Sequence, residues 1–356
     1  MDVAIIGATG DVGRAICGSL IERGELGASS RLQLVGRAGG ASGAAVHGLR
    51  VDLIDAYDER APHIDVATRP EDVVADVVVM TAGLTVPTGT GQVIDRDRLA
   101  ADNRRVFEEH ADALAEHGSG HEVVIVVSNP VELAVEVFAR RLGRHRVIGM
   151  GAWLDTLRFR REIAATLGIR RHRVSGFVAG QHGDMMVPLW SSVRLRGLDP
   201  DERAEIVDRL RGDRTLTSFR SEVAAAKQRT ASTPDVAQAF AAIDAYPPDV
   251  QAVIRPYLTH QSGAKTAHGT ANATVDLVRT VLDGRDIVVA GQVLLDGEIE
   301  LGGAPWAGVL GVPVAVGPDG WTRVMLDDPA ADESRALWEV AQSINESVIA
   351  WGGGAR

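Results

Sequence analysis

The amino-acid sequence predicts an α/β protein, in which a doubly wound parallel sheet is followed by an α+β region. Three observations support this prediction. Short apolar runs alternate with helical stretches over residues 1–150, which is typical of a parallel sheet covered on both faces. A strand, a glycine turn and a helix open the chain. Strand-like runs split by Gly and Pro over residues 287–326 indicate an antiparallel sheet.

The composition narrows the class of protein. With 356 residues, 45% of them hydrophobic and 24% charged, the chain is long enough for two globular domains. Its formal net charge of -11 argues against nucleic acid as a partner, because phosphate binding depends on cations. Cys17 is the single cysteine, which excludes an internal disulfide. No apolar run is long enough to cross a membrane and no signal peptide precedes the first strand, so we expect a cytoplasmic protein.

The segment 3–24 is typical of a buried strand, a tight turn and an amphipathic helix. Glycines spaced three residues apart in such a turn let the backbone approach a pyrophosphate and pack the helix against the strand. The pyrophosphate would accept hydrogen bonds from the free N–H groups of the helix N-terminus. The sequence therefore predicts a Rossmann-type dinucleotide-binding domain over residues 1–150. The expected contacts in this turn are Gly7, Gly10, Asp11, Val12 and Gly13.

The second predicted strand, residues 32–35, is followed by Gly36 and Arg37. In this position a carboxylate would bind the two ribose hydroxyls of NAD and repel a 2′-phosphate, whereas an arginine attracts that phosphate. The sequence therefore favours NADP over NAD. The alternative is an arginine in a surface loop with no role in cofactor binding.

Two further strands, residues 77–81 and 123–128, end in the motifs TAG and SNPVE. Ligands of parallel sheets bind at the carboxyl ends of the strands, so these motifs are candidates for the cofactor crevice. Asn129 precedes Pro130 and could instead serve only to form a turn. The candidate residues are Thr81, Ala82, Gly83, Ser128 and Asn129.

A long segment rich in glycine, threonine and proline lies between Gly83 and Asn103 and leads into a helix over 97–117. A loop of this length beside a site is more often a lid than a fixed surface feature. Arg96, near its end, could swing over a bound substrate or could pair with a neighbouring aspartate in water.

The motif VAGQHGDMMVPLWS, residues 178–191, places His182 in a glycine turn after an apolar strand. A lone histidine in such a turn is usually structural, but this one has candidate partners. Asp155 and Arg158 are three residues apart in the helical part of segment 146–169 and so share one helix face. A surface ion pair contributes only about 0.3–0.5 kcal/mol. The spacing therefore favours a guanidinium fork for a carboxylate beside an acid that orients a histidine.

We expect mainly helices in the segments 199–284 and 332–351. Residues 199–229 form a polar, helix-rich stretch, and Pro247-Pro248 with Pro256 should break any long helix after it. Amphipathic helices are expected over 265–284 and 332–351.

Taken together, these motifs resemble the lactate/malate dehydrogenase superfamily, most closely its NADP-tolerant malate or L-2-hydroxyacid dehydrogenases of archaeal type. The resemblance covers nearly the whole chain and implies an α+β substrate domain of that family's type over residues 151–356. The ordered motifs are GATGDVG, LVGR, GLRVDLIDA, TAG, RDRLAADN, SNPVE, LDTLRFR and GQHGDMMVPLWS.

The resemblance also implies roles for individual residues. His182 would be the proton acceptor and donor, oriented by Asp155, and Arg158 would hold the substrate carboxylate. Arg96 would polarise the reacting carbonyl, and Asn129 would lie between substrate and cofactor. Further implied contacts are Thr266 in the substrate pocket and Asn103 at the cofactor. The family also implies a homodimer or a homotetramer.

The chain departs from the family in two places. Malate-specific relatives carry an additional loop arginine for the second carboxylate, yet residues 84–95 contain no Arg or Lys. This argues against oxaloacetate, since an unpaired carboxylate in a closed site loses its hydration without compensation. The segment 220–263 is predicted to be an insertion.

The predicted function is hydride transfer between NAD(P) and an L-2-hydroxy acid or 2-oxo acid, with no metal. The alternatives are a non-catalytic dinucleotide-binding sensor and, with less support, an NAD-dependent glycosidase, which would require a metal. A short-chain reductase would need a Tyr-x-x-x-Lys pair, which the sequence lacks.

Overall fold

The computed structural model describes residues 1–85 and 96–352. The first half of its sheet consists of six strands that pair in parallel in the order β3-β2-β1-β4-β5-β6. The order reverses between β1 and β4, which is the switch point where ligands of such sheets bind. The parallel sheet predicted from the apolar runs is confirmed. The strands are β1 (Val3–Ile6), β2 (Arg31–Val35), β3 (His63–Ala67), β4 (Val77–Met80), β5 (Val123–Val126) and β6 (Val147–Gly149).

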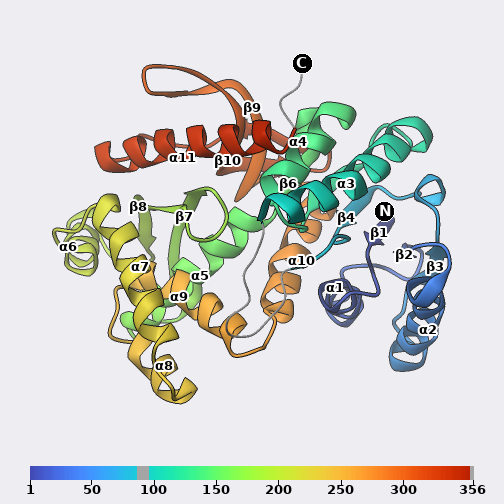
Figure 1. The fold of residues 1–356 in the computed structure, drawn as a ribbon, viewed down its shortest axis with the longest axis horizontal. Helices are drawn as coiled ribbons and strands as arrows, with labels where there is room; N and C mark the ends of the chain where they lie inside the picture. The colour runs from blue at the N-terminus through green and yellow to red at the C-terminus, as the bar shows by residue number, and fades with distance from the viewer. Residues whose placement is uncertain (86–95, 353–356) are drawn as a thin grey trace.

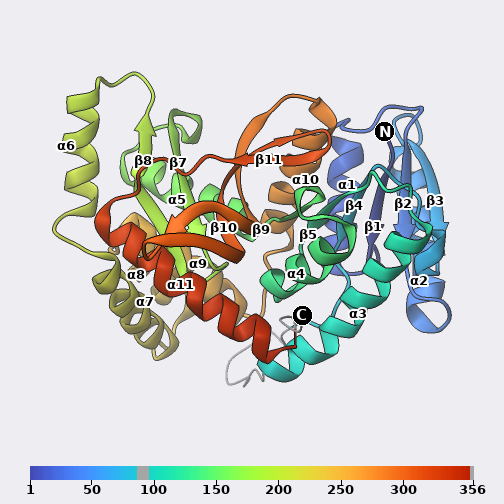
Figure 2. The same ribbon diagram turned by 90° about the horizontal axis from the view of Figure 1, so that it is seen from above.

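The central strands β1, β4 and β5 are rich in β-branched side chains and are buried on both faces. The sequences VAII of β1, VVVM of β4 and VVIV of β5 are buried at every position, as expected for strands between two layers of helices. The helices that flank this part of the sheet appear in blue and green in Figures 1 and 2. They are α1 (Asp11–Glu22), α2 (Gly40–Tyr57), α3 (Arg96–His117) and α4 (Val131–Leu142).

The second half of the sheet is antiparallel and continues from β6 through β9. The long strands β9 and β10 form a hairpin, β11 pairs with β10, and β7 and β8 complete the edge. The antiparallel sheet predicted for residues 287–326 is therefore present. These strands are β7 (Val174–Gly180), β8 (Met186–Leu195), β9 (Ile287–Leu301), β10 (Ala304–Gly317) and β11 (Gly320–Val324).

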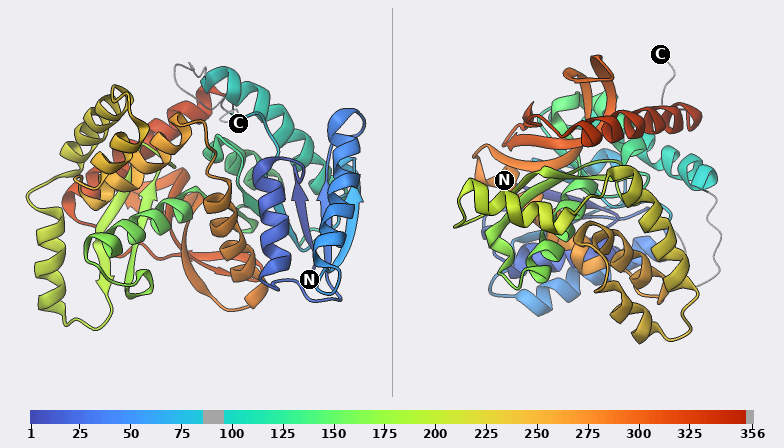
Figure 3. Two further views of the ribbon diagram at one scale, coloured as in Figure 1. Left: turned by 90° about the horizontal axis from the view of Figure 1, so that it is seen from below. Right: turned by 90° about the vertical axis from the view of Figure 1, so that its left-hand side faces the viewer.

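Most helices of the second half gather around β7 and β8, on the side away from β3 (Figures 1 and 3). Helix α10 lies between the two halves of the molecule and packs against α1 as well as α5. The helices are α5 (Gly151–Thr166), α6 (Pro200–Arg211), α7 (Leu216–Ala231), α8 (Val236–Ile243), α9 (Pro248–Gln261), α10 (Ala267–Asp283) and α11 (Ala331–Ala350). Short 3₁₀ turns span Pro70–Asp72, Arg144–Arg146 and Arg171–Arg173.

The sequence-based expectation of a helix break at Pro256 is wrong, because α9 continues through this residue. Pro248 opens the helix, at a position where its missing N–H costs nothing. Pro256 removes one hydrogen bond inside the helix, but α9 packs against α5 and α7 and its first half is buried. Tertiary packing therefore outweighs the local preference.

The boundary at residue 150 and the insertion over 220–263 remain predictions. The latter segment forms most of α7 and all of α8 and α9. In the part of the chain that the structure describes, no helix combines the length and the apolar character needed to cross a bilayer.

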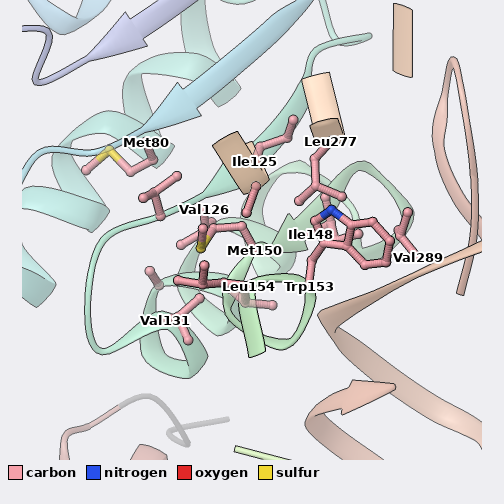
Figure 4. Close-up of a cluster of buried hydrophobic side chains, with 14 of the residues drawn as sticks. Met80, Ile125, Val126, Val131, Ile148, Met150, Trp153, Leu154, Leu277 and Val289 are labelled. Atoms are coloured by element: carbon pink, nitrogen blue, oxygen red, sulfur yellow. The ribbon is translucent and has the colours of Figure 1, made fainter. Parts of the chain in front are cut away.

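A buried cluster lies where the parallel strands meet α4, α5 and α10 (Figure 4). It joins Met80 and Val126 of the parallel sheet to Trp153 at the start of α5 and Leu277 of α10. Gly149, at the end of β6, fits into this core because a Cβ there would lie 2.7 Å from a methyl group of Val131. The cluster therefore sets the position from which α5 begins.

Candidate active site

His182 lies in the turn between β7 and β8, and three hydrogen bonds fix this turn. Its backbone N–H donates to Oε1 of Glu132 at 2.9 Å, and its ring Nδ1 lies 2.8 Å from Oδ2 of Asp155. The backbone N–H of Gly183 donates to the same carboxylate oxygen at 3.0 Å. Gly183 has a φ of +93°, a conformation that glycine adopts without strain. The imidazole is therefore held in one orientation, with Nε2 left for a ligand.

Asp155 connects the histidine to an arginine. Both Asp155 and Arg158 come from α5, and an Nη1 N–H of Arg158 donates to Oδ1 of Asp155 at 3.2 Å. Only 3% of the Asp155 side chain and 14% of the Arg158 side chain are exposed. The carboxylate thus binds the imidazole through one oxygen and the guanidinium through the other, while the remaining N–H groups of Arg158 can take a ligand.

The electrostatics of this group favour a charged imidazole. Burial alone would raise the pKa of Asp155. The positive charges of His182 and Arg158, and the hydrogen bonds that Asp155 accepts from His182 and Gly183, hold that pKa below the ordinary value. Burial alone would lower the pKa of His182, yet the charge and hydrogen bond of Asp155 raise it above the ordinary value. Burial raises the pKa of Glu132. His182 is therefore suited to accept and return a proton near neutral pH.

Sequence reasoning missed three residues that support this arrangement. A Cβ on Gly151 would lie 2.6 Å from Cγ of His182, so the ring packs directly on the first turn of α5. Glu132 holds the backbone of His182, although in the sequence it stood out only as the last letter of the SNPVE motif. Gln292 of β9 accepts a hydrogen bond from the backbone N–H of Ala152 at 3.0 Å. The local signals available were a glycine at the strand-to-helix junction for Gly151 and the SNPVE motif for Glu132, and the sequence held none for Gln292.

A cavity of about 610 Å³ lies over the carboxyl ends of β1, β2 and β4. A Cβ on Gly7 would stand 2.7 Å from the backbone nitrogen of Ala82, so only glycine permits this close approach of the two strand ends. His110 of α3 also lines the cavity, and its buried Nδ1 has no hydrogen-bond partner among the described residues. The predicted residues in the lining are Gly7, Gly10, Gly36, Arg37, Thr81, Ala82 and Gly83.

Other predicted cofactor residues lie next to this lining rather than in it. A Cβ on Gly13 would lie 2.4 Å from the carbonyl oxygen of Gly7, so Gly13 packs α1 against the turn. Asp11 opens α1 and forms an ion pair with Lys265 of the second half at 2.5 Å. Val12 is half-buried in the first turn of α1.

A second group of predicted residues fixes the ends of β4 and β5. The hydroxyl of Ser128 donates to the carbonyl oxygen of Ala82 at 2.6 Å. The amide of Asn103 donates to the carbonyl oxygens of Asn129 at 2.6 Å and Leu84 at 3.0 Å. Asn129 itself is exposed, and its peptide bond to Pro130 is cis. These contacts fix the backbone that follows β4 and β5.

Two further predictions concern Thr266 and Arg96. Thr266 and Arg158 line one cavity of about 310 Å³ between α5, α9 and α10. Arg96 opens α3, but its side chain, like the predicted lid residues 86–95, lies outside the described residues. Within the described ranges, no group of three His, Cys, Asp or Glu side chains is placed to hold a metal ion.

Comparison with known proteins places this chain in a family. Residues 1–149 match the family model for the NAD-binding domain of lactate/malate dehydrogenase. The chain is 31% identical over 265 residues to a malate dehydrogenase of Haloferax volcanii, covering 72% of this chain and 71% of the relative. The chain belongs to the lactate/malate dehydrogenase family. It is accordingly an oxidoreductase that uses a nicotinamide dinucleotide and acts on hydroxy acids and oxo acids.

Other relatives extend the similarity over the whole chain. A malate dehydrogenase of Halobacterium salinarum is 29% identical over 356 residues, covering 96% of this chain and 97% of the relative. Among solved structures, the malate dehydrogenase from Aeropyrum pernix has a TM-score of 0.72 at 22% identity, with 98% of this chain and 97% of that chain covered. The lactate dehydrogenase from Cryptosporidium parvum has a TM-score of 0.73 at 22% identity, with 100% of this chain and 98% of that chain covered. The two structures support the fold.

Proposed function

We propose that this family member catalyses reversible hydride transfer between NAD(P) and an L-2-hydroxy acid, with His182 as proton acceptor and donor. One observation carries the proposal: a single buried carboxylate, Asp155, contacts both His182 at 2.8 Å and Arg158 at 3.2 Å. A purely structural ion pair would not need an imidazole on its second oxygen, nor a guanidinium with N–H groups left for a carboxylate.

The residues of the larger cavity fit a dinucleotide. Glycines at Gly7 and Gly10 give the turn the close backbone approach that a pyrophosphate needs, and α1 directs its free N–H groups there. The unpartnered Nδ1 of His110 offers a polar contact within the same cavity. The bound dinucleotide would supply the group that accepts or donates the hydride.

The protein side chains would then provide binding and proton transfer. In the direction of oxidation, neutral His182 takes the hydroxyl proton at Nε2, because Nδ1 is engaged by Asp155. Asp155 stabilises the resulting imidazolium and keeps the ring in place. Arg158 binds the substrate carboxylate through two parallel hydrogen bonds. Roles for Arg96 at the reacting oxygen, and for Asn129 and Thr266 beside the substrate, rest on the family resemblance.

Substitution of His182 tests the proposal. His182→Asn should lower kcat by about 10² to 10⁴, the usual contribution of general acid–base catalysis, while binding of NADPH is unchanged. The matched control is His47→Asn, at an exposed histidine of α2, which should retain wild-type kcat. The assay follows NADPH absorbance with a panel of 2-oxo acids. Near-normal turnover by His182→Asn would contradict the assignment.

For the cofactor, we propose a preference for NADP over NAD. The support is the lining of the larger cavity, which includes Arg37, just after β2, and Ser42. The backbone N–H of Arg37 donates to the Ser42 hydroxyl at 3.4 Å. A 2′-phosphate placed there would meet a guanidinium and a helix N-terminus. Arg37→Asp should reverse the ratio of kcat/KM for NADPH and NADH, and an unchanged ratio would refute the preference.

Three further predictions concern the oligomeric state, the location and the domain division of the protein. We propose that the active form is a homodimer or a homotetramer, as the family resemblance implies, and sedimentation equilibrium would distinguish these from a monomer. The cytoplasmic location and the division of the chain into a dinucleotide domain over 1–150 and a substrate domain over 151–356 remain predictions.

A further inference from the structure

A second buried acid, Glu132, supports the histidine turn, the residues 181–185 that carry His182. Glu132 lies in the first turn of α4, and only 4% of its surface is exposed. Its Oε1 accepts the backbone N–H of His182 at 2.9 Å. Within the part of the chain that the structure describes, no Lys or Arg forms an ion pair with Glu132. The hydrogen bond from His182 therefore compensates part of the cost of burying this acid.

The first turn of α4 is a rigid support for this contact. Val131, the residue before Glu132, belongs to the buried cluster of Figure 4 together with Leu154 of α5. The segment that precedes α4 is also fixed, because the amide of Asn103 donates to the carbonyl oxygen of Asn129 at 2.6 Å. Glu132 therefore connects the histidine turn to the core of the protein and to the backbone that follows β5.

The histidine turn depends on such contacts because glycines lie on both sides of its histidine. Gly180 and Gly183 have φ values of +84° and +93°, and glycine restricts the backbone least of all residues. Asp155 holds the turn from α5, through the ring Nδ1 and the Gly183 N–H. Glu132 holds it from α4. Without Glu132, the backbone N–H of His182 would lose its acceptor and the ring would be free to turn away from Asp155.

We propose that Glu132 is a positioning residue for proton transfer: by accepting the backbone N–H of His182, it keeps the imidazole on Asp155 and Nε2 within reach of the substrate. The proposal rests on the function proposed above and adds a residue that acts through His182. An uncharged acceptor is sufficient, since a backbone N–H also donates to the carbonyl oxygen of a carboxylic acid or an amide. Burial raises the pKa of Glu132 and so favours its neutral form. An amide in this position should therefore replace the acid, whereas a thioether should not.

The matched variants Glu132→Gln and Glu132→Met test the role of the acceptor. Both new side chains are close in size to that of glutamate, but only the amide offers an oxygen to the His182 N–H. Glu132→Met should lower kcat by about ten- to a hundredfold, because a misplacement of about 1 Å can cost about 10²-fold in rate. Glu132→Gln keeps the acceptor and should recover kcat to within about threefold of the wild-type value.

A second measurement separates positioning from a general loss of structure. The titration of the His182 ring, followed by NMR in the protein without substrate and assigned with His182→Asn, reports the contact of the ring with Asp155. Glu132→Met should move the midpoint to lower pH, because the displaced ring loses the carboxylate that stabilises its charged form. Glu132→Gln should keep the wild-type midpoint. The other charged groups around His182 are the same in both variants: they are Asp155 and Arg158 of α5 and, in the turn, Asp184, which pairs with Lys227 of α7.

The control is Glu136→Met, one turn later in α4. Glu136 is also 4% exposed, but it pairs with Arg140 instead of the histidine turn. Its loss should lower the urea midpoint of unfolding and leave both kcat and the titration of His182 unchanged. If Glu132→Met is too unstable to purify, Glu132→Asp takes its place with the same expected changes, because its shorter side chain withdraws the acceptor and keeps a carboxyl group.

The outcomes separate the two proposals. A loss in Glu132→Met that Glu132→Gln restores, with Glu136→Met unaffected, supports the positioning role. Equal losses in Glu132→Gln and Glu132→Met, or a wild-type kcat and midpoint in Glu132→Met, overturn it and leave the proposed function intact. Turnover of no 2-oxo acid with either cofactor overturns the proposed function, whereas the titration of His182 still decides whether Glu132 holds the ring on Asp155.

Discussion

Gly151→Ala is the sharpest test of how the proposed catalytic residue His182 is positioned. Gly151 is the first residue of α5, and a Cβ built on it would lie 2.6 Å from Cγ and 2.7 Å from Cβ of His182. Carbon atoms in contact are about 3.5–4.0 Å apart, so the ring or the helix must move by about 1 Å. Because the imidazole is fixed by Asp155 and by its own backbone contact with Glu132, this displacement breaks the hydrogen bond at Nδ1.

We expect Gly151→Ala to lower kcat strongly and to leave cofactor binding unaffected. A displacement of about 1 Å in a catalytic group can cost about 10²-fold in rate. We therefore expect Gly151→Ala to lower kcat by roughly a hundredfold. The dissociation constant of the cofactor, measured by fluorescence, should change by less than about twofold, because Gly151 does not line the larger cavity. The activity should be measured by absorbance in both directions of the reaction.

A matched control separates displacement from helix propensity. Gly48 lies inside α2, and a Cβ built on it would have nothing within 4 Å, so Gly48→Ala should stabilise the helix by up to about 1 kcal/mol and leave kcat unchanged. If Gly151→Ala kept wild-type kcat, the ring would not pack on α5 as the structure has it, and the reasoning about His182 would be refuted.

Two further predictions concern pH and stability. The pKa of His182 is raised because Asp155 stabilises its charged form. Since only the neutral ring accepts a proton, kcat/KM for oxidation should rise with pH through this pKa. Conversely, kcat/KM for reduction should fall with pH, because only the charged ring donates a proton. Asp155→Asn should move both midpoints to lower pH, and unchanged pH profiles would contradict the assigned pair. Asp249 is buried, and Nη2 of Arg214 donates to both of its oxygens at 2.7 Å. Arg214→Met should lower the free energy of unfolding in urea by about 3–5 kcal/mol, and adding Asp249→Asn should recover part of the loss; an unchanged urea midpoint would show that the pair contributes nothing.

Much of the fold could be predicted from the sequence because the patterns that specify strands, turns and helix faces each lie within a short segment of the chain. Strands buried on both faces appear as continuous apolar runs, and β1, β4 and β5 are examples. The glycine turn after β1 was recognisable because backbone approach requires glycine at a fixed spacing. Asp155 and Arg158 were recognisable as a pair because a helix places residues three apart on one face.

The remaining parts of the site depend on contacts between distant segments. The contact between Glu132 and His182 spans 50 residues, and that between Gln292 and Ala152 spans 140. Their register is set by the packing of α4 and β9 against the core, and no periodicity in either segment encodes it. Local signals also misled at Pro256, which suggested a helix break where tertiary packing maintains a helix.

The junction of the two half-sheets explains why this site can be rigid. Gly149 of β6 pairs with Gln292 of β9, where the parallel strands meet the antiparallel ones. The same Gln292 accepts the hydrogen bond of Ala152 at the start of α5, three residues before Asp155. The helix that carries Asp155 and Arg158 is thus attached by a hydrogen bond to β9, the strand that pairs with the last strand of the parallel half. Because a misplacement of about 1 Å can cost about 10²-fold in rate, a fixed junction here favours a constant position of Asp155 and Arg158 relative to the sheet.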